Sequence, residues 1–455
     1  MNPYIQYMYS YPHKTAYRSL EGVFLQDYAR LLSGGGHGLY LHVPFCQAKC
    51  GYCNLFSVTG QEEEEMDRYL DAVERQAGQY REILSAYQPE FSEASVGGGT
   101  PLLLTEQQLE RMFEILNGCF RYSKDRELWI ETAPNQTVPE KLRILKQAGV
   151  TRVSMGIQSF LDSELKALGR QHGARRAKEA LYLLKTFGFP CINVDLIYGI
   201  PGQTAESLLA SLKQAVEFAP DEIFLYPLYL KHGAWLTQDF AKWQGEKPET
   251  VYARYQEASA FLQGEGYRQD SMRRFVRRKR GSGGQEEIRS DLECGFGTSL
   301  ALGCGGRSYL GNLHFCTPYA VRGTECLRQL RRFEETEDFS QITHGMLLSE
   351  EERKRRYVIR HLLIRPGLSL SRYRKHFGSD AREDFGLLQS WEEQGYVHML
   401  RTGETEYLTL TETGLGLSDY LGPQLISGEV RRKMKEWEVV YGRQDDIVPG
   451  ESQKL

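Results

Sequence analysis

A short apolar run leads directly into a cysteine-rich loop at residues 39–53, which read LYLHVPFCQAKCGYC. The run over Leu39–Val43 predicts a β-strand. Cys46, Cys50 and Cys53 follow it with the spacing C-x3-C-x2-C, and no fourth cysteine stands nearby in the sequence. The sequence therefore places three thiolates on one loop, at the end of the first predicted strand.

Three thiolates on one loop suit an iron–sulfur cluster that keeps one iron open. They can bind three irons of a [4Fe–4S] cube and leave the fourth for a small molecule, much as a catalytic zinc site keeps one position for its reactant. A structural zinc site needs four ligands, and His42 lies on the strand before the loop, where it is poorly placed to be the fourth. Three unrelated buried cysteines would rarely show this spacing by chance. We therefore expect Cys46, Cys50 and Cys53 to be the catalytic, metal-binding residues.

From residue 39 to residue 230 the chain alternates short β-branched or apolar runs with amphipathic stretches. This alternation is typical of repeated βα units on a parallel sheet. The predicted strands lie near Leu39–Val43, Ala94–Val96, Leu128–Ile130, Arg152–Ile157, Ile192–Leu196 and Glu222–Tyr226. Helical patterns between or after them cover Glu63–Tyr87, Glu106–Leu116 and Ala205–Phe218. Residues 39–230 therefore predict an α/β core, a partial (β/α)6 barrel of the TIM type.

Two segments flank this core in the sequence. Residues 1–38 are an aromatic-rich arm that loosens into Gly34–Gly36 before the first strand. Residues 231–340 contain a predicted helix at 248–265 and the basic run Arg273–Arg280. We interpret this second segment as an extension with a basic loop that closes the barrel.

The C-terminal part predicts a second, smaller domain over residues 341–443. Ser349 starts a capping box before a helix, and two shorter helical patterns follow. Tyr396–Leu400 and Tyr407–Leu410 then predict a β-hairpin. Helices followed by a two-stranded wing predict a helical, winged-helix-like cap, and the polar residues 444–455 predict a disordered tail.

Polar residues stand where several predicted strands end. Gly97–Thr100 follows the second strand, and Glu131, Gln158 and Asp195 follow the third, fourth and fifth. Burying such a group without a partner costs about 1–3 kcal/mol or more. Each one singly is explained by satisfied core polarity, but the carboxyl ends of barrel strands share one mouth, so the set favours a shared ligand. Carboxylates suit ribose hydroxyls, and missing side chains at glycines let a ligand approach the backbone.

With these residues in place, residues 39–230 resemble radical S-adenosylmethionine (SAM) enzymes of the oxygen-independent coproporphyrinogen III dehydrogenase family. That group also includes haem chaperones and radical SAM methyltransferases. Leu39–Cys53, Arg152–Phe160 and Val194–Thr204 carry the resemblance. It implies a [4Fe–4S] cluster that cleaves SAM reductively, so that a 5′-deoxyadenosyl radical takes hydrogen from the substrate. One or two SAM molecules fit this family pattern.

The resemblance also implies roles for individual residues. Tyr40, Gly98 and Glu131 are expected to contact the SAM that is bound to the cluster. Residues expected around a second SAM or the substrate are Tyr52, Gly99, Thr100, Gln158, Arg170, Asp195 and Tyr229. The segment Gly303–Leu310 is similar to a glycine-rich family segment that returns to the cluster, which adds Arg307 to the cofactor-binding candidates.

Two features point to different branches of that group. The dehydrogenases have a further cysteine two residues after the third, where this chain has Leu55. Tyr9–Pro12, however, is similar to the arm that covers the dehydrogenase site. Three functions stay open: an oxidoreductase acting on an anionic substrate such as a tetrapyrrole, a methyltransferase that uses a second SAM, and a haem chaperone. We take the oxidoreductase first, with Arg273–Arg280 either a solvated loop or a lid that pairs with carboxylates.

Composition limits the partners and the compartment. A formal net charge of -4 over 455 residues gives no global field for nucleic acid or an anionic membrane surface. No segment has 18 uninterrupted apolar residues, and the first 20 residues lack a signal or transit pattern, so we expect a cytoplasmic protein without a membrane span. Free thiols are expected for its nine cysteines. The expected partners are a small-molecule substrate, with haem among the candidates, and an electron donor such as flavodoxin or ferredoxin.

Overall fold

The computed structural model describes residues 2–8, 10–229, 246–278, 297–403 and 405–442. Several sequence-based predictions fall on other residues. Tyr9 of the arm, Lys279 and Arg280 of the basic run and the tail 444–455 lie outside the described residues.

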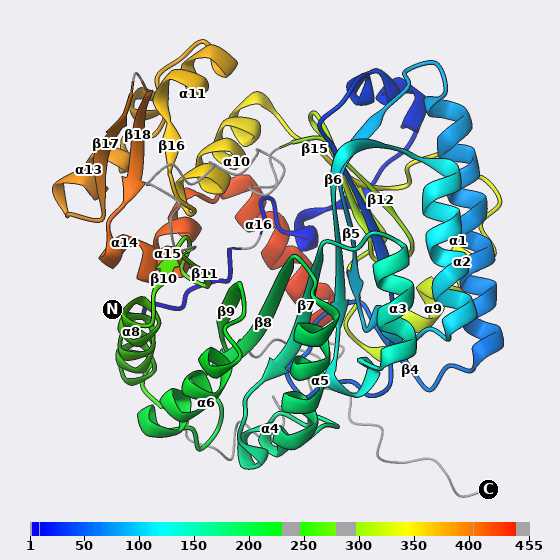
Figure 1. The fold of residues 1–455 in the computed structure, drawn as a ribbon. Helices are drawn as coiled ribbons and strands as arrows, with labels where there is room; N and C mark the ends of the chain where they lie inside the picture. The colour runs from blue at the N-terminus through cyan, green and yellow to red at the C-terminus, as the bar shows by residue number, and fades with distance from the viewer. Residues whose placement is uncertain (1, 9, 230–245, 279–296, 404, 443–455) are drawn as a thin grey trace, which may run out of the picture.

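A 13-stranded sheet forms the centre of the molecule (Figure 1). Its middle is a run of parallel strands in chain order: β2 (His37–Val43), β5 (Glu90–Gly98), β6 (Arg121–Thr132), β7 (Arg152–Gln158), β8 (Cys191–Tyr198) and β9 (Glu222–Pro227). These are the six strands that the sequence predicts, and their parallel pairing is confirmed. The fold is therefore the expected α/β arrangement of repeated βα units.

The sheet extends beyond the predicted core on both sides. β12 (Ser299–Leu302) pairs in parallel with β2, and the antiparallel strands β13 (Arg307–Leu310), β14 (Leu313–Cys316), β15 (His344–Leu347) and β1 (Arg18–Ser19) continue from it. On the other side β11 (Arg274–Arg277) and β10 (Tyr267–Gln269) follow β9. Within the described residues the sheet is open, with β1 and β10 at its edges. The prediction for residues 231–340 missed these strands.

The basic run needs a correction. Arg274–Arg277 is strand β11, and the side chains of Arg273 and Arg274 are buried, not solvated. Arg274 forms an ion pair with Glu222, which is 1% exposed and also lies 2.5 Å from Arg152. Part of the basic run therefore lies in the interior of the sheet. The solvated-loop alternative is wrong for these two arginines, and the sequence showed no sign of it because the carboxylate that pairs with Arg274 lies more than 50 residues away.

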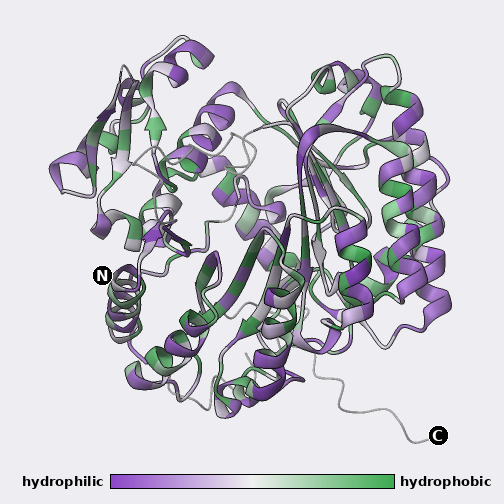
Figure 2. Ribbon diagram, in the orientation of Figure 1, coloured by the Kyte–Doolittle hydropathy of each residue, from purple (hydrophilic) through white to green (hydrophobic). Residues whose placement is uncertain are grey.

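Helices between the strands cover the outer face of the sheet (Figure 1). They are α1 (Glu63–Leu84), α2 (Glu106–Cys119), α3 (Pro139–Gln147), α4 (Asp162–Ala167), α5 (Ala174–Phe187) and α6 (Ala205–Glu217), with α8 (Pro248–Gly264) and α9 (Gly323–Glu334) farther along the chain. Thr105 caps α2 through a capping box with Gln108, as predicted. Figure 2 shows green and purple residues mixed along these helices, and in α1, α2, α5 and α6 most of the buried residues are apolar.

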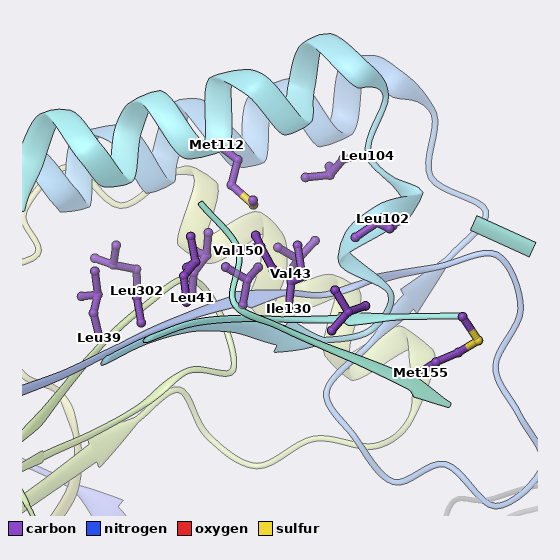
Figure 3. Close-up of a cluster of buried hydrophobic side chains, with 14 of the residues drawn as sticks. Leu39, Leu41, Val43, Leu102, Leu104, Met112, Ile130, Val150, Met155 and Leu302 are labelled. Carbon is purple, nitrogen blue, oxygen red and sulfur yellow. The ribbon is translucent and has the colours of Figure 1, made fainter. Parts of the chain in front are cut away.

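The two faces of the parallel strands differ in polarity. Leu39, Leu41 and Val43 of β2 are buried against the helices, and Figure 3 shows them beside Met112 of α2. The alternate residues of the same strands are largely polar, for example Glu131 on β6 and Asp195 on β8. Since side chains alternate between faces along a strand, the inner face of this sheet is polar and can hold a ligand.

The C-terminal part combines helices with a small sheet. It contains α10 (Glu350–Leu362), α11 (Leu370–Phe377), α12 (Ala381–Asp384), α13 (Leu387–Glu393), α14 (Glu412–Gly416), α15 (Ser418–Leu421) and α16 (Gly428–Trp437). β16 (Leu368–Ser369), β18 (Thr405–Leu410) and β17 (Val397–Thr402) form a three-stranded sheet. Ser349 caps α10, and the predicted helices with a following hairpin are present. No described helix is both long and apolar enough to span a membrane.

The N-terminal arm is packed against this C-terminal part. Met8, Tyr11 and Tyr17 belong to the same buried cluster as Trp391 and Leu410. The hydroxyl of Tyr11, 1% exposed, donates a hydrogen bond to Glu352 of α10. The N-terminal arm and the C-terminal part are thus packed against each other.

Candidate functional site

A cavity of about 480 Å³ lies at the carboxyl ends of the parallel strands. Its walls come from the cysteine loop after β2, the glycine run after β5, the ends of β6 to β9, and the N-terminal arm. The structure brings most predicted site residues to this one cavity, namely Cys46, Cys50, Tyr52, Cys53, Gly98, Gly99, Thr100, Glu131, Gln158, Arg170, Asp195 and Tyr229. The polar residues that follow the predicted strands therefore indicated where the cavity lies.

Tyr40 and Arg307 are not among the residues that line the cavity. The Tyr40 hydroxyl hydrogen-bonds Nδ1 of His42 at 3.0 Å, and Nε2 of His42 hydrogen-bonds the Phe56 carbonyl at 2.8 Å. Since a carbonyl only accepts, Nε2 donates and Nδ1 accepts from Tyr40. Arg307 donates to Ser10 of the arm at 2.5 Å. Both side chains hold the walls in place in this structure instead of facing the cavity.

His42 is structural in this arrangement. Burial lowers its pKa to about 4, so the ring is neutral, and both of its nitrogens are occupied. It is therefore a poor fourth metal ligand, as its place in the sequence suggested.

Three glycines at the carboxyl end of β5, Gly97 to Gly99, make room for this loop and for a carboxylate. A Cβ on Gly97 would lie 2.8 Å from the Glu131 carboxyl carbon, and one on Gly98 would lie 2.7 Å from the His42 ring. A Cβ on Gly99 would lie 2.5 Å from the carbonyl oxygen of Phe45. Gly98 also has a φ of +119°, which side chains rarely adopt. The run is thus a cradle for the cysteine loop, and any residue larger than glycine would displace it.

The three thiols of the loop lie in the cavity wall, and each receives a donor. Thr100 Oγ1 lies 3.9 Å from Cys46 Sγ, Arg170 Nη1 lies 3.1 Å from Cys50 Sγ, and Cys53 accepts from the backbone of Leu55. Burial raises the pKa of the Cys46 thiol to about 11. The thiol is therefore protonated near neutral pH in this structure, and a bound metal would favour its thiolate form.

The donor set fits a cluster better than a single ion. Among the described residues, no three His, Cys, Asp or Glu side chains surround one point as a single metal ion requires. In a cubane each thiolate binds a different iron, so the ligands need not converge on one position. The cavity wall supplies the thiols of Cys46, Cys50 and Cys53 and no further cysteine.

Two carboxylates line the cavity from β6 and β8, the strands on either side of β7. Glu131 accepts a hydrogen bond from the Gly98 N–H at 3.0 Å, and Asp195 accepts from Asn193 Nδ2 at 2.8 Å. Desolvation raises the pKa of Glu131 to about 7 and that of Asp195 to about 6. Both groups therefore gain or lose charge close to neutral pH, and a ligand that donates hydrogen bonds would favour their ionised forms.

Gln158 sits at an irregularity of the sheet. Its φ is +75°, and the pairing of β7 with β8 shifts register between Gly156 and Gln158. Such a bulge turns a side chain at the rim of a sheet, and a positive φ in a residue other than glycine is uncommon. Here it places Gln158 in the cavity wall.

Several cavity residues were missed from the sequence. Ser154 and Tyr226 line the cavity from predicted strands, and the two-residue alternation could have found them. Tyr7 and Lys14 come from the arm, and no local pattern marks them. Arg273 lies just before β11 and begins the basic run, for which the sequence left a lid as one of two alternatives. The guanidinium carbon of Arg273 lies 4.0 Å from the centre of the Tyr7 ring. These three residues reach the site only through tertiary packing.

Residues 40–215 match the family model described as the Radical SAM superfamily. This match covers the cysteine loop and the strands β5 to β8. The chain is 34% identical over 193 residues to the heme chaperone HemW of Bacillus subtilis, which covers 42% of this chain and 50% of that relative. It is 27% identical over 423 residues to the oxygen-independent coproporphyrinogen III oxidase of Escherichia coli, covering 88% and 89%.

The solved structure of that radical SAM relative, the coproporphyrinogen III oxidase HemN of Escherichia coli, has the same fold. Its TM-score is 0.76 at 24% identity, and the match covers 92% of this chain and 96% of HemN. The matched regions span 50% of the Bacillus subtilis HemW and 61% of a Mycobacterium tuberculosis HemW. The likeness to the oxidase thus extends well beyond residues 40–215, over most of this chain.

Proposed function

We propose that this chain holds a [4Fe–4S] cluster on Cys46, Cys50 and Cys53 and uses it to cleave SAM. Held by these three thiols, the cluster would supply the electron for reductive cleavage of SAM to methionine and a 5′-deoxyadenosyl radical. The observation that carries the proposal is the three-thiol loop in a cavity wall cradled by glycines.

The surrounding residues would bind and orient SAM. Gly98 and Glu131 offer a backbone and a carboxylate on the side of β5 and β6, and Asp195, held by Asn193, offers a second carboxylate on β8. Carboxylates accept hydrogen bonds from ribose hydroxyls and from ammonium groups. Ile197 of β8 and Tyr226 of β9 also line the cavity and would exclude water from the reacting centre.

The substrate we propose is an anionic tetrapyrrole, and the activity that of an oxidoreductase of the coproporphyrinogen III oxidase type. Lys14, Lys49, Arg170 and Arg273 line the same cavity as Glu131 and Asp195, so cationic side chains outnumber carboxylates. Arginine and lysine pair well with propionate groups. The likeness to the Escherichia coli oxidase over 88% of this chain supports this choice over a function limited to the core.

A haem chaperone is the second candidate. HemW relatives match with 29–34% identity over 193–317 residues, and Leu55 stands where the resemblance to the dehydrogenases calls for a cysteine. Methyl transfer from a second SAM is the third. An electron donor such as flavodoxin or ferredoxin would serve all three, since each uses a reducible cluster.

Anaerobic reconstitution with iron and sulfide tests the proposal. Wild-type protein with dithionite and SAM is expected to form 5′-deoxyadenosine, and Cys50→Ala is expected to lose both the cluster and this product. Cys119→Ala, which alters a cysteine at the end of α2, is the matched control and keeps both. A colourless, iron-free wild-type protein loaded with zinc would refute the cluster assignment.

Products then separate the three candidates. Consumption of coproporphyrinogen III with release of CO2 supports the oxidoreductase. S-adenosylhomocysteine or methylthioadenosine would instead indicate methyl transfer, and tight haem binding without SAM turnover would indicate the chaperone.

A further inference from the structure

Arg170 reaches the cysteine loop from the segment between α4 and α5. Its Nη1 donates to Cys50 Sγ at 3.1 Å, and its Nη2 donates to the carbonyl oxygen of Gly156 at 2.5 Å. We propose that this hydrogen bond to the sulfur sets the reduction potential of the cluster, making Arg170 a positioning residue for electron entry. The inference rests on the proposed function, because it needs a cluster on Cys50.

Arg170 differs from the other donors to the three sulfurs. Cys46 accepts from the hydroxyls of Thr100, at 3.9 Å, and Ser57, and Cys53 accepts from a backbone N–H. Those donors are neutral, whereas the guanidinium carries a full positive charge. Charge-assisted hydrogen bonds are roughly twice as strong as neutral ones. Among the described residues that donate to these sulfurs, Arg170 therefore has the largest electrostatic effect.

The direction of the effect follows from charge. Reduction adds one electron to the cluster, so the reduced form is more negative than the oxidised form. A cationic N–H donor at a ligand sulfur stabilises the more negative form and raises the reduction potential. In the half-buried wall of this cavity the interaction is screened less than in water. Arg170 itself is neither oxidised nor reduced.

The arginine is fixed before any ligand arrives. The backbone N–H of Arg170 donates to Leu165 at the end of α4, and the N–H of Gly51, next to Cys50, donates to Leu168. The cysteine loop and the segment that carries Arg170 are thus tied to each other by backbone hydrogen bonds. Buried Nε of Arg170 has no protein partner within the described residues, so the side chain can also meet a ligand in the cavity.

The test compares reconstituted wild-type protein with Arg170→Met and Arg170→Lys. Arg176→Met is the matched control, because Arg176 donates to the Thr137 carbonyl at 2.7 Å and does not line the cavity. Iron and sulfide contents are measured first, then the midpoint potential of the cluster by a redox titration followed by electron paramagnetic resonance. We expect Arg170→Met to lower the reduced-to-oxidised ratio at a fixed potential at least tenfold, which is about 59 mV for one electron. Arg170→Lys should shift less, and Arg176→Met should match wild type.

Equal midpoints in wild type and Arg170→Met, with equal cluster content, would overturn the inference. So would loss of the cluster in both Arg170 variants but not in Arg176→Met, because Arg170 would then serve assembly instead. A change confined to the dissociation constant for SAM, measured on oxidised protein, would also overturn it. Wild-type protein without a cluster contradicts the proposed function itself, so the two failures are distinguishable.

Discussion

Asp419 of α15 ties three distant parts of the chain together. Its side chain is fully buried and forms an ion pair with Arg273, accepts from the Tyr229 hydroxyl at 2.6 Å, and accepts from the Met8 backbone at 3.2 Å. Arg273 in turn lies over the ring of Tyr7. The carboxylate thus holds the arm, the end of β9 and the start of β11 at the cavity.

Asp419→Asn keeps the shape of this side chain and removes its charge. Arg273, whose side chain is 9% exposed, would then be a buried cation without its carboxylate, which costs about 3–5 kcal/mol. Because about 1.4 kcal/mol corresponds to a factor of ten, a loss of about 3 kcal/mol would raise the opened fraction of the arm about 100-fold. Chymotrypsin can cleave after Tyr4 and Tyr7 when the arm is detached from the cavity. The cleavage rate therefore reports the detached fraction, provided that the arm closes again faster than it is cleaved.

Glu436→Gln is the matched control for Asp419→Asn. Glu436 pairs with Arg18 of the arm, but its side chain is 48% exposed, and such a pair contributes only about 0–1 kcal/mol. The double variant Asp419→Asn with Arg273→Met should recover part of the lost protection, because it leaves no buried charge unpaired. A folded Asp419→Asn protein that is cleaved at the wild-type rate would refute the argument that the carboxylate anchors the arm.

Two further predictions concern the ligand-free cavity. Gly99→Ala puts a Cβ 2.5 Å from the Phe45 carbonyl oxygen, so the iron bound per protein should fall severalfold. The control Gly118→Ala in α2 has no atom within 4 Å of the new Cβ and should leave the iron content unchanged. Equal iron contents in the two variants would disprove the cradle. Glu131 has a pKa raised from 4.5 to about 7, so its stabilising effect is present below its unfolded pKa and is lost as pH rises through about 7. Glu131→Gln lacks this loss, so the melting temperature of the variant relative to wild type should be higher at pH 8 than at pH 5. The effect should be smaller than the pKa shift alone suggests, because water in the cavity screens the charge. The same difference in melting temperature at both pH values would contradict this prediction.

The strands and the cavity were predictable because their signals are local. Leu39–Val43 and Arg152–Ile157 show the two-residue alternation of a strand that is apolar on one face, and the polar residue after each strand marks the rim. Parallel strands in chain order then force those rims together. Arg273 carried no such signal: its charge looked like that of a solvated run, and only the position of Asp419, 146 residues later, explains its burial. The hydrogen bond between Tyr40 and His42 was likewise not predictable, because the position of the His42 ring depends on Gly98 and Phe56, which lie farther along the chain.

The residues that could separate one radical SAM function from another lie largely outside the region that the family model matches. Residues 40–215 contain the cysteines, the glycine cradle and both cavity carboxylates, all of which serve SAM in the proposed function. Tyr229 and Arg273 lie outside it and both contact Asp419, and Arg273 lies over the ring of Tyr7. The backbone of Met8 also donates to Asp419, 411 positions later in the chain. A substrate recognised by charge would contact Arg273, whose position depends on that carboxylate. Substrate choice in this chain should therefore respond to changes at Asp419, while SAM cleavage without substrate should respond to changes at Cys50 and Gly99.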